Sequence, residues 1–266
     1  MPTAPSLTLP GNAPGRASRI PFPATTVGVE HECKWALEQA DGDTAAGVSA
    51  RSASTGPHAF FDSGPLSLLT PVRRPLVFVQ SSLYVDDQRH RLIRAGHSLS
   101  VVVNTGAASS VCWLTLKQAV HWRGWRDGLE VSQRLTPAEV PGALNDPSLL
   151  PVAHLRGSRL AEGPLRAVGT ATQRRHKHLG RTADGVEVAY SLDLVTFRAP
   201  EPGVAPVRGG VFVEIEVNSS APAALRALDR LAHEVDAWLG RPRDRTTKAQ
   251  RALAALGTPH QEGTAI

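Results

Sequence analysis

Apolar and polar residues alternate along most of this chain, in short segments typical of β-strands. Each segment is 8 to 13 residues long and rich in Val, Leu and Thr, and Gly, Pro, Asn or Asp separates it from the next. The segments are TVGVEHECKWAL, PLVFVQSSLYVDD, HSLSVVVN, SSVCWLTLKQAV, GLEVSQRL, GVEVAYSLDLVTF and GVFVEIEV. This pattern predicts a largely antiparallel sheet or barrel.

Two stretches predict helices. A capping box with proline at the first helical position opens a short helix from Thr136 to about Leu144, although Pro141-Gly142 favours a single turn. Residues 221 to 239 place apolar side chains along one face at three- and four-residue steps. After Gly240 the chain predicts a short basic helix. The longest helix is therefore expected near the C-terminal end.

Composition shifts indicate the domain organisation. Residues 1–25 are rich in Pro, Gly, Ala, Ser and Thr and predict a disordered tail. Residues 41–65 are rich in small residues and predict a long loop. We expect one domain over 26–256 and a flexible tail over 257–266.

Overall composition excludes several classes of protein. The chain has 266 residues, of which 41% are hydrophobic and 20% charged, as in an ordinary globular protein. It has no apolar run of the roughly 18 residues that a membrane helix needs, and its N-terminus does not resemble a secretory signal. We therefore expect a cytoplasmic protein in which Cys33 and Cys112 are reduced, buried thiols. The sequence leaves its oligomeric state open.

The charge balance favours an anionic partner. The net charge is +5, and only four of the 29 basic residues are lysines, at positions 34, 117, 177 and 248. A phosphorylated small molecule and nucleic acid are both anionic partners of this kind. The basic run over residues 172–181 is typical of a solvated loop or a nucleic-acid contact, although some of its side chains could instead turn inward as phosphate ligands. Nucleic acid does not explain the paired acids of the strands, so we expect a phosphorylated small molecule rather than nucleic acid or a membrane.

The first strand carries a charged face. Side chains two residues apart share one face of a strand, so Glu30, Glu32 and Lys34 point the same way. Two carboxylates beside a cation suit a divalent metal together with phosphate oxygens. The alternative is a solvent-facing strand of mixed charge.

Later strands repeat this arrangement. Glu214 and Glu216 share a face in the last strand, and Asp193 lies within an apolar strand. Lys117 shares a face with Thr115. The remaining charged candidates are Arg126 and Glu130, four residues apart. If the strands close into a barrel, these acids and bases line its interior together.

These residues resemble the CYTH superfamily, the triphosphate tunnel metalloenzymes. Glu30-x-Glu32-x-Lys34 resembles the family signature, and Glu214-x-Glu216 resembles its later acidic pair. Further matches, in order along the chain, are Tyr84-Val-Asp86, Arg94-Ala-Gly96, Leu114-Thr115-Leu116-Lys117, Leu192-Asp193 and Lys248. The resemblance covers roughly residues 27 to 256.

The resemblance implies an α+β fold: an antiparallel eight-stranded β-barrel, open as a tunnel at both ends, with peripheral helices. It implies a metal-dependent phosphohydrolase that cleaves inorganic or organic triphosphate with Mg²⁺ or Mn²⁺. The implied metal ligands are Glu30, Glu32 and Glu216, with Glu214 and Asp193 as candidates. The implied catalytic phosphate-binding residues are Lys34, Lys117 and Arg126, and Glu130, Arg174 and Lys248 complete the substrate-binding set.

The sequence departs from the family pattern at the phosphate clamp. Ser100 and Val102 occupy the two positions where the family usually has arginines, and Gly128 replaces a glutamate. Each charge-assisted contact to phosphate contributes about 1.5–3 kcal/mol, so two lost arginines weaken triphosphate binding unless other residues replace them. This favours an alternative: a repurposed tunnel that binds or converts a partly apolar or less phosphorylated ligand.

Overall fold

The computed structural model of this protein describes residues 24–38, 60–106 and 110–256. The tail predicted for 257–266 lies outside the described residues, as does the tail predicted for 1–25 up to residue 23. Most of the loop predicted for 41–65 also lies outside them. In the part that is described, Phe60 and Phe61 are buried in the core, and the 3-10 helix η1 (Pro65–Leu68) follows them.

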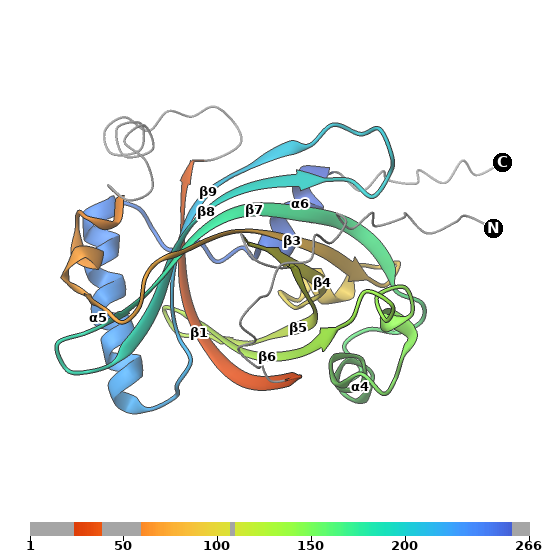
Figure 1. The fold of residues 1–266 in the computed structure, drawn as a ribbon, viewed down its shortest axis with the longest axis horizontal. Helices are drawn as coiled ribbons and strands as arrows, with labels where there is room; N and C mark the ends of the chain where they lie inside the picture. Colours follow the sequence, from red (N-terminus) through yellow and green to blue (C-terminus); the bar gives the residue numbers. More distant parts are fainter. Residues whose placement is uncertain (1–23, 39–59, 107–109, 257–266) are drawn as a thin grey trace, which may run out of the picture.

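Eight antiparallel strands close into a barrel, which confirms the predicted fold class (Figure 1). Around the barrel the order is β7-β3-β4-β5-β6-β1-β9-β8, and β8 pairs with β7 to close it. A two-residue strand, β2 (Thr70–Pro71), adds to the edge of β7. The barrel strands are β1 (Thr25–Glu38), β3 (Leu76–Asp86), β4 (Ser98–Thr105), β5 (Ser110–Trp122), β6 (Arg126–Leu135), β7 (Arg166–Arg181), β8 (Glu187–Arg198) and β9 (Val207–Val217).

The alternation along each strand places polar side chains inside the barrel and apolar ones outside. On β1, Glu32 and Lys34 line an internal cavity, whereas Cys33 and Trp35 belong to an apolar cluster on the outer surface. Interior and exterior positions must alternate because successive side chains point to opposite faces of a strand. The hydrophobic core of this protein therefore lies mostly between the barrel and its helices.

Two helices cover the apolar outer surface on different sides of the barrel (Figure 1). Helix α5 (Pro222–Leu239) begins with Pro222 in its first turn and ends at Gly240, which has a left-handed φ of 61°. Its buried face packs on β1, β8 and β9. The short helix α4 (Leu150–Gly157) covers β5 and β6 instead.

A third helix packs across one end of the barrel. Helix α6 (Lys248–Leu256) places Ala249 and Ala252 against inward-facing apolar side chains of β7, β8 and β9, among them Val195 and Phe212. The resemblance implied a tunnel open at both ends. The packing of α6 against one end is consistent with the tunnel fold and places Lys248 beside the interior of the barrel.

One predicted helix is absent. No α-helix forms at 136–144: Glu139 binds the backbone N–H and hydroxyl of Thr136, and only the 3-10 helix η2 (Ala143–Asn145) follows Pro141-Gly142. Of the alternatives for the basic run over 172–181, the structure shows a strand, because the run lies within β7. The short helix α3 (Arg91–Arg94) was not predicted, and it is held by Asp86, which accepts the backbone N–H groups of Leu92 and Ile93.

The thiols of Cys33 and Cys112 are both buried and unpaired, as predicted. Burial raises the pKa of the Cys33 thiol to about 12, so it carries no nucleophilic thiolate at neutral pH. None of the helices that the structure describes is long and apolar enough to cross a membrane.

Candidate functional site

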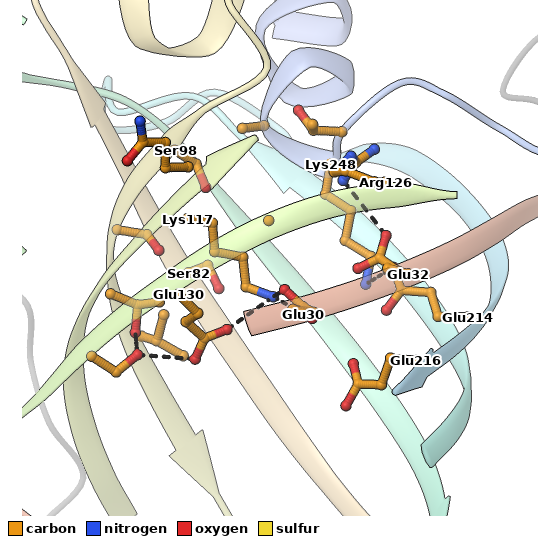
Figure 2. Close-up of a pocket in the computed structure, with 18 of the residues that line it drawn as sticks. Glu30, Glu32, Ser82, Ser98, Lys117, Arg126, Glu130, Glu214, Glu216 and Lys248 are labelled. Atoms are coloured by element: carbon orange, nitrogen blue, oxygen red, sulfur yellow. Dashed lines mark hydrogen bonds and ion pairs between the residues drawn. The ribbon is translucent and has the colours of Figure 1, made fainter. Parts of the chain in front are cut away.

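The barrel encloses a cavity of about 730 Å³, and most of the sequence-predicted site residues line it. They come from segments far apart in the chain. Lining residues among the candidates are Glu30, Glu32, Lys34, Lys117, Arg126, Glu130, Glu214, Glu216 and Lys248 (Figure 2). The barrel therefore brings together acids and bases that the strand pattern could only assign to a common face.

Lys117 is shared between two carboxyl groups. Its ammonium lies 2.7 Å from a Glu30 oxygen and 3.1 Å from a Glu130 oxygen. Burial raises the pKa of Glu30 to about 8, and Lys117 offsets this only in part. The same ammonium lowers the pKa of Glu130. Burial therefore opposes the ionised form of Glu30, and Lys117 stabilises the ionised forms of both Glu30 and Glu130.

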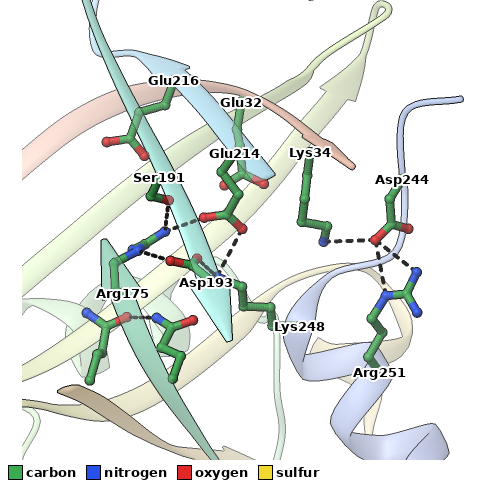
Figure 3. A network of polar contacts seen from close by, with 12 residues as sticks. Glu32, Lys34, Arg175, Ser191, Asp193, Glu214, Glu216, Asp244, Lys248 and Arg251 are labelled. Carbon is green, nitrogen blue, oxygen red and sulfur yellow. Dashed lines mark hydrogen bonds and ion pairs between the residues drawn. The ribbon is translucent and has the colours of Figure 1, made fainter. Parts of the chain in front are cut away.

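A second, deeper group of ion pairs surrounds Asp193 (Figure 3). Asp193 is completely buried, with 0% of its surface exposed, and it binds Arg175 at 2.9 Å and Lys248 at 2.5 Å. Both cations also bind Glu214, and Lys248 does so at 3.0 Å. Burial opposes ionisation of Glu214, yet Lys248 and Arg175 hold its pKa well below the usual range.

This geometry corrects the prediction for Asp193 as a candidate metal ligand. Asp193 does not line the cavity, and both of its oxygens bind cations. Its role is that of a buried counter-ion that fixes Arg175 and Lys248. The capping box at the start of α6 helps to place Lys248, because the side chains of Thr247 and Gln250 each accept the other's backbone N–H.

Two further pairs lie along β1 and β9. Glu216 binds the ammonium of Lys177 at 2.6 Å, and Glu32 lies 3.5 Å from the guanidinium of Arg126. Burial alone would raise the pKa of Glu216, but Lys177, Arg175 and Lys117 lower it to about 2. Glu216 is therefore a carboxylate throughout the physiological range.

Lys34 was predicted to bind phosphate, and the structure gives it another role. Its ammonium donates to the carbonyl oxygen of Thr246 and lies 3.4 Å from Asp244, in the segment that joins α5 to α6 (Figure 3). Only 2% of Lys34 is exposed. Burial lowers its pKa, while Asp244 opposes this change. Lys34 therefore ties the segment before α6 to β1.

Arg174 was also predicted to bind phosphate, and this is wrong. It is exposed on the outside of β7, because Arg175 and Lys177 hold the inward positions of that strand. Both residues lie within the basic run, whose side chains were candidates to turn inward in place of the missing arginines. The signal that could have placed them is the alternation Gln173, Arg175, Lys177, since these side chains must share one face.

The cavity contains the carboxylate ligands that a divalent cation needs, but these carboxylates are not arranged around a common point. Glu32 and Glu216 are direct neighbours across β1 and β9, and Glu30 follows on the same face. Such carboxylate oxygens are the ligands that Mg²⁺ and Mn²⁺ prefer. Among the described residues, however, no three Asp, Glu, His or Cys side chains stand close enough to hold an ion. Each of these acids is instead turned toward its own lysine or arginine.

The cavity wall formed by β3 and β4 is uncharged. Its lining residues are Gln80, Ser82, Tyr84, Ser98, Ser100, Val102 and Asn104. Figure 2 shows Ser82 and Ser98 across the cavity from Glu32 and Glu214. The cavity therefore has a charged wall, on β1, β7 and β9, and an uncharged wall, and the two meet at β5 and β6.

No family model matches this sequence, and no curated protein sequence matches it. Several solved structures, however, have a similar fold. The PH1819 protein from Pyrococcus horikoshii OT3 aligns with a TM-score of 0.51 at 15% identity, over 85% of this chain and 98% of that chain. The likeness is one of fold.

Two further solved structures are similar at lower TM-scores. A candidate adenylate cyclase from Bacillus halodurans aligns with a TM-score of 0.48 at 15% identity, over 84% of this chain and 95% of that chain. A candidate adenylyl cyclase from Hippeastrum, described as having a dominant triphosphatase activity, aligns with a TM-score of 0.48 at 15% identity, over 87% of this chain and 98% of that one.

Proposed function

We propose that this protein is a CYTH-type, metal-dependent phosphohydrolase that cleaves a triphosphate inside its barrel. The convergence of acids and bases in one closed cavity is the observation that carries the proposal. Glu30, Glu32, Lys117, Glu216 and Lys248 matched the family motifs one by one in the sequence, and all of them line this cavity.

The cations of the charged wall would hold the phosphate groups. Lys117, Lys177 and Lys248 each bind a carboxylate at 3.1 Å or less, so they already stand where an anionic oxygen is bound. An incoming phosphate offers oxygens of the same charge and similar size. It would therefore replace a carboxylate as partner, as when Lys117 leaves Glu30 for a phosphate oxygen.

Glu30, Glu32 and Glu216 would hold the divalent ion once their basic partners turn to the phosphates. The ion, when bound, neutralises charge on the phosphate oxygens and promotes ionisation of a water molecule. In the hydrolysis, a water oxygen would form a bond to the terminal phosphorus as the bridging P–O bond breaks. The diphosphate, or diphosphate ester, would leave with the bridging oxygen, and the water would release its proton to solvent. The lysines and arginines keep the three groups in line.

The test is phosphate release from tripolyphosphate, ATP and thiamine triphosphate, each with Mg²⁺ and with Mn²⁺. We expect release that requires metal and falls at least 100-fold in Glu30→Gln, which removes a metal ligand while keeping the shape of the side chain. Glu187→Gln is the matched control, because Glu187 makes an exposed ion pair with Arg181 at the turn end of β7 and β8 and does not line the cavity. Folded protein that releases no phosphate, or Glu30→Gln with full activity, would contradict the proposal.

One observation favours a second candidate, a repurposed tunnel for a less phosphorylated ligand. Every lysine or arginine that lines the cavity in the described residues already has a carboxylate partner within 4.0 Å. A triphosphate would find no spare cation, and Ser100 and Val102 add none. A ligand with one or two phosphates needs fewer partners to be exchanged.

A further inference from the structure

A serine, a histidine and an aspartate meet on the outer surface of the barrel. His31 on β1 points outward, because its neighbours Glu30 and Glu32 face the cavity. Its Nδ1 lies 2.7 Å from Oδ1 of Asp127, the residue opposite it on β6, and its Nε2 lies 3.0 Å from Oγ of Ser220. Nucleophile, base and carboxylate follow one another as in a hydrolytic triad.

The hydrogen bonds fix the orientation of the His31 ring. An ionised carboxylate can only accept hydrogen bonds, so Nδ1 is the nitrogen that carries the proton. In the neutral ring Nε2 is then an acceptor, and the hydroxyl of Ser220 donates to it. Asp127 is itself held in place, because it accepts from Nε1 of Trp125 at 2.6 Å and lies 3.4 Å from the guanidinium of Arg123. His31 is therefore a base directed at Ser220.

The three groups differ in their access to solvent. Ser220 is exposed, whereas the side chains of His31 and Asp127 are only 8% and 15% exposed. A molecule in solution can therefore reach the hydroxyl, while the base and the carboxylate behind it are largely shielded from water. A serine hydroxyl is a weak nucleophile by itself, and an adjacent base is what activates it.

The first turn of helix α5 follows Ser220 directly. Ala221 caps the helix without a side-chain hydrogen bond, and the first intrahelical bond runs from Leu225 to the Ala221 carbonyl. The backbone N–H groups of Ala223 and Ala224 therefore have no acceptor within the helix. These N–H groups and the helix dipole stabilise negative charge at this end of α5, which is where the Ser220 side chain begins.

We propose that Ser220, His31 and Asp127 form an acyl-transfer site that hydrolyses small carboxylic esters on the outside of the barrel. Ser220 is the nucleophile, His31 is the general base and acid, and Asp127 is the positioning residue that keeps the proton on Nδ1. An ester whose carbonyl group is open to solvent fits the exposed hydroxyl. The site is independent of the proposed phosphohydrolase, because none of its three residues lines the cavity.

The reaction proceeds in two halves through an acyl-serine. The Oγ of Ser220 bonds to the carbonyl carbon while its proton passes to Nε2 of His31, and the carbonyl π electrons move to the oxygen. The tetrahedral carbon then expels the alkoxide, which leaves as the alcohol with the proton from Nε2. In the second half a water oxygen bonds to the acyl carbon, its proton passes through Nε2 to the Oγ of Ser220, and the carboxylic acid leaves.

Labelling with diisopropyl fluorophosphate tests the proposal on the full chain. This reagent phosphorylates an activated serine with loss of fluoride and leaves ordinary serines unmodified. With EDTA present, we expect labelled protein, and mass spectrometry of its peptides should place the label on Ser220. p-Nitrophenyl acetate should give a burst of p-nitrophenol equal in amount to the protein, because acylation precedes the slower release of acetate.

Variants at two neighbouring serines assign the reactivity. Ser220→Ala should lower the rates of labelling and of the burst at least about 100-fold. Ser219→Ala is the matched control, because Ser219 is also exposed but accepts the backbone N–H of Ala221 and does not contact His31. His31→Gln should have the same effect as Ser220→Ala, with circular dichroism to show that the variant is folded.

Asp127→Asn tests the positioning role. The asparagine amide can donate to Nδ1, which moves the ring proton of His31 to Nε2 and removes the acceptor for the Ser220 hydroxyl. We expect the maximal burst rate to fall at least about 100-fold, while the ester concentration that gives half of this rate stays the same. A role in folding alone would leave the maximal rate of the folded protein unchanged.

The outcomes separate the two proposals. No label on the wild type, label on other residues with Ser220 unmodified, or a burst that survives in folded Ser220→Ala would overturn the acyl-transfer site. Each of these results leaves the phosphohydrolase unaffected. Labelled Ser220 in a protein that releases no phosphate would overturn the phosphohydrolase and keep the acyl-transfer site.

Discussion

Strands β1 and β4 both alternate between the cavity and the outer surface, but the side chains that face the cavity are charged on β1 and uncharged on β4. Both send alternate side chains into the cavity and pack the others in an apolar cluster outside. The inward row of β1 is Glu30, Glu32, Lys34, whereas that of β4 is Ser98, Ser100, Val102, Asn104. The outward faces of β1 and β4 must be apolar because they pack against other elements, whereas the inward faces line a cavity and can be charged or uncharged.

The two walls also differ in how strongly their residues depend on one another. Asp193, Glu214, Arg175 and Lys248 form one connected network of buried charges. At the edge of the uncharged wall, where β5 and β6 join it, Thr115 and Ser132 share a single hydrogen bond of 2.9 Å. Removing one charged group from the charged wall leaves its partners buried without a counter-ion, which is costly at low dielectric. Removing one hydroxyl from the uncharged wall leaves at most one hydrogen-bonding group unpaired.

The largest expected effect is on the charged wall. Asp193→Asn leaves Arg175 and Lys248 with Glu214 as their only shared carboxylate, so we expect the free energy of unfolding to fall by about 3 kcal/mol. Urea unfolding followed by circular dichroism measures it. The matched control is Asp184→Asn, in an exposed pair with Arg230, for which we expect little change because solvent screens the pair. A loss below about 1 kcal/mol for Asp193→Asn would show that the network is not tightly coupled.

The charged wall should also lose stability in acid. The pKa of Glu216 is about 2 in the folded protein, below its ordinary value of 4.5, so its ion pairs stabilise the fold above pH 4.5. This stabilisation is lost as the pH falls toward 2, because the folded protein must then take up the proton. Between pH 5 and pH 3 the contribution of Glu216 falls by roughly 2 kcal/mol.

The difference in unfolding free energy between wild type and Glu216→Gln isolates this contribution. We expect this difference in unfolding free energy, measured in urea with EDTA present, to be smaller at pH 3 than at pH 5 by roughly 2 kcal/mol. A difference that stays constant with pH would mean that the pKa of Glu216 is not lowered by Lys177 and Arg175.

The smallest effect is expected on the uncharged wall. Thr115→Val removes the hydrogen bond to Ser132, which keeps its second bond to Glu130 at 3.0 Å, so the loss should be about 1 kcal/mol. The same urea titration measures it. A loss as large as that of Asp193→Asn would remove the distinction between the two walls.

Much of the barrel could be predicted because its strands repeat with a period of two. The segments predicted around Glu30 and Glu216 correspond to β1 and β9, with the correct inward face. The resemblance to a known family added the closure and the number of strands. Helix α5 followed from the apolar face at three- and four-residue steps over 221–239.

Strand β7 could not be predicted because neither of its faces is apolar in its second half. Gln173, Arg175 and Lys177 face the cavity, and Arg174 faces solvent. A polar sequence in which apolar residues do not alternate with polar ones does not predict a strand, and it is typical of a loop. The error at Arg174 has the same origin: a shift of one residue in a strand moves every side chain to the other face.

The sequence by itself determined which residues share a face of a strand or helix, since these periodicities are local properties of the backbone. The tertiary structure alone decided their partners. Lys248 meets Asp193, 55 residues away, because α6 packs inside one end of the barrel, and Lys34 turns from the cavity to Thr246 because the same packing brings that carbonyl to β1. Such pairings depend on contacts between segments distant in the chain, which no local pattern records.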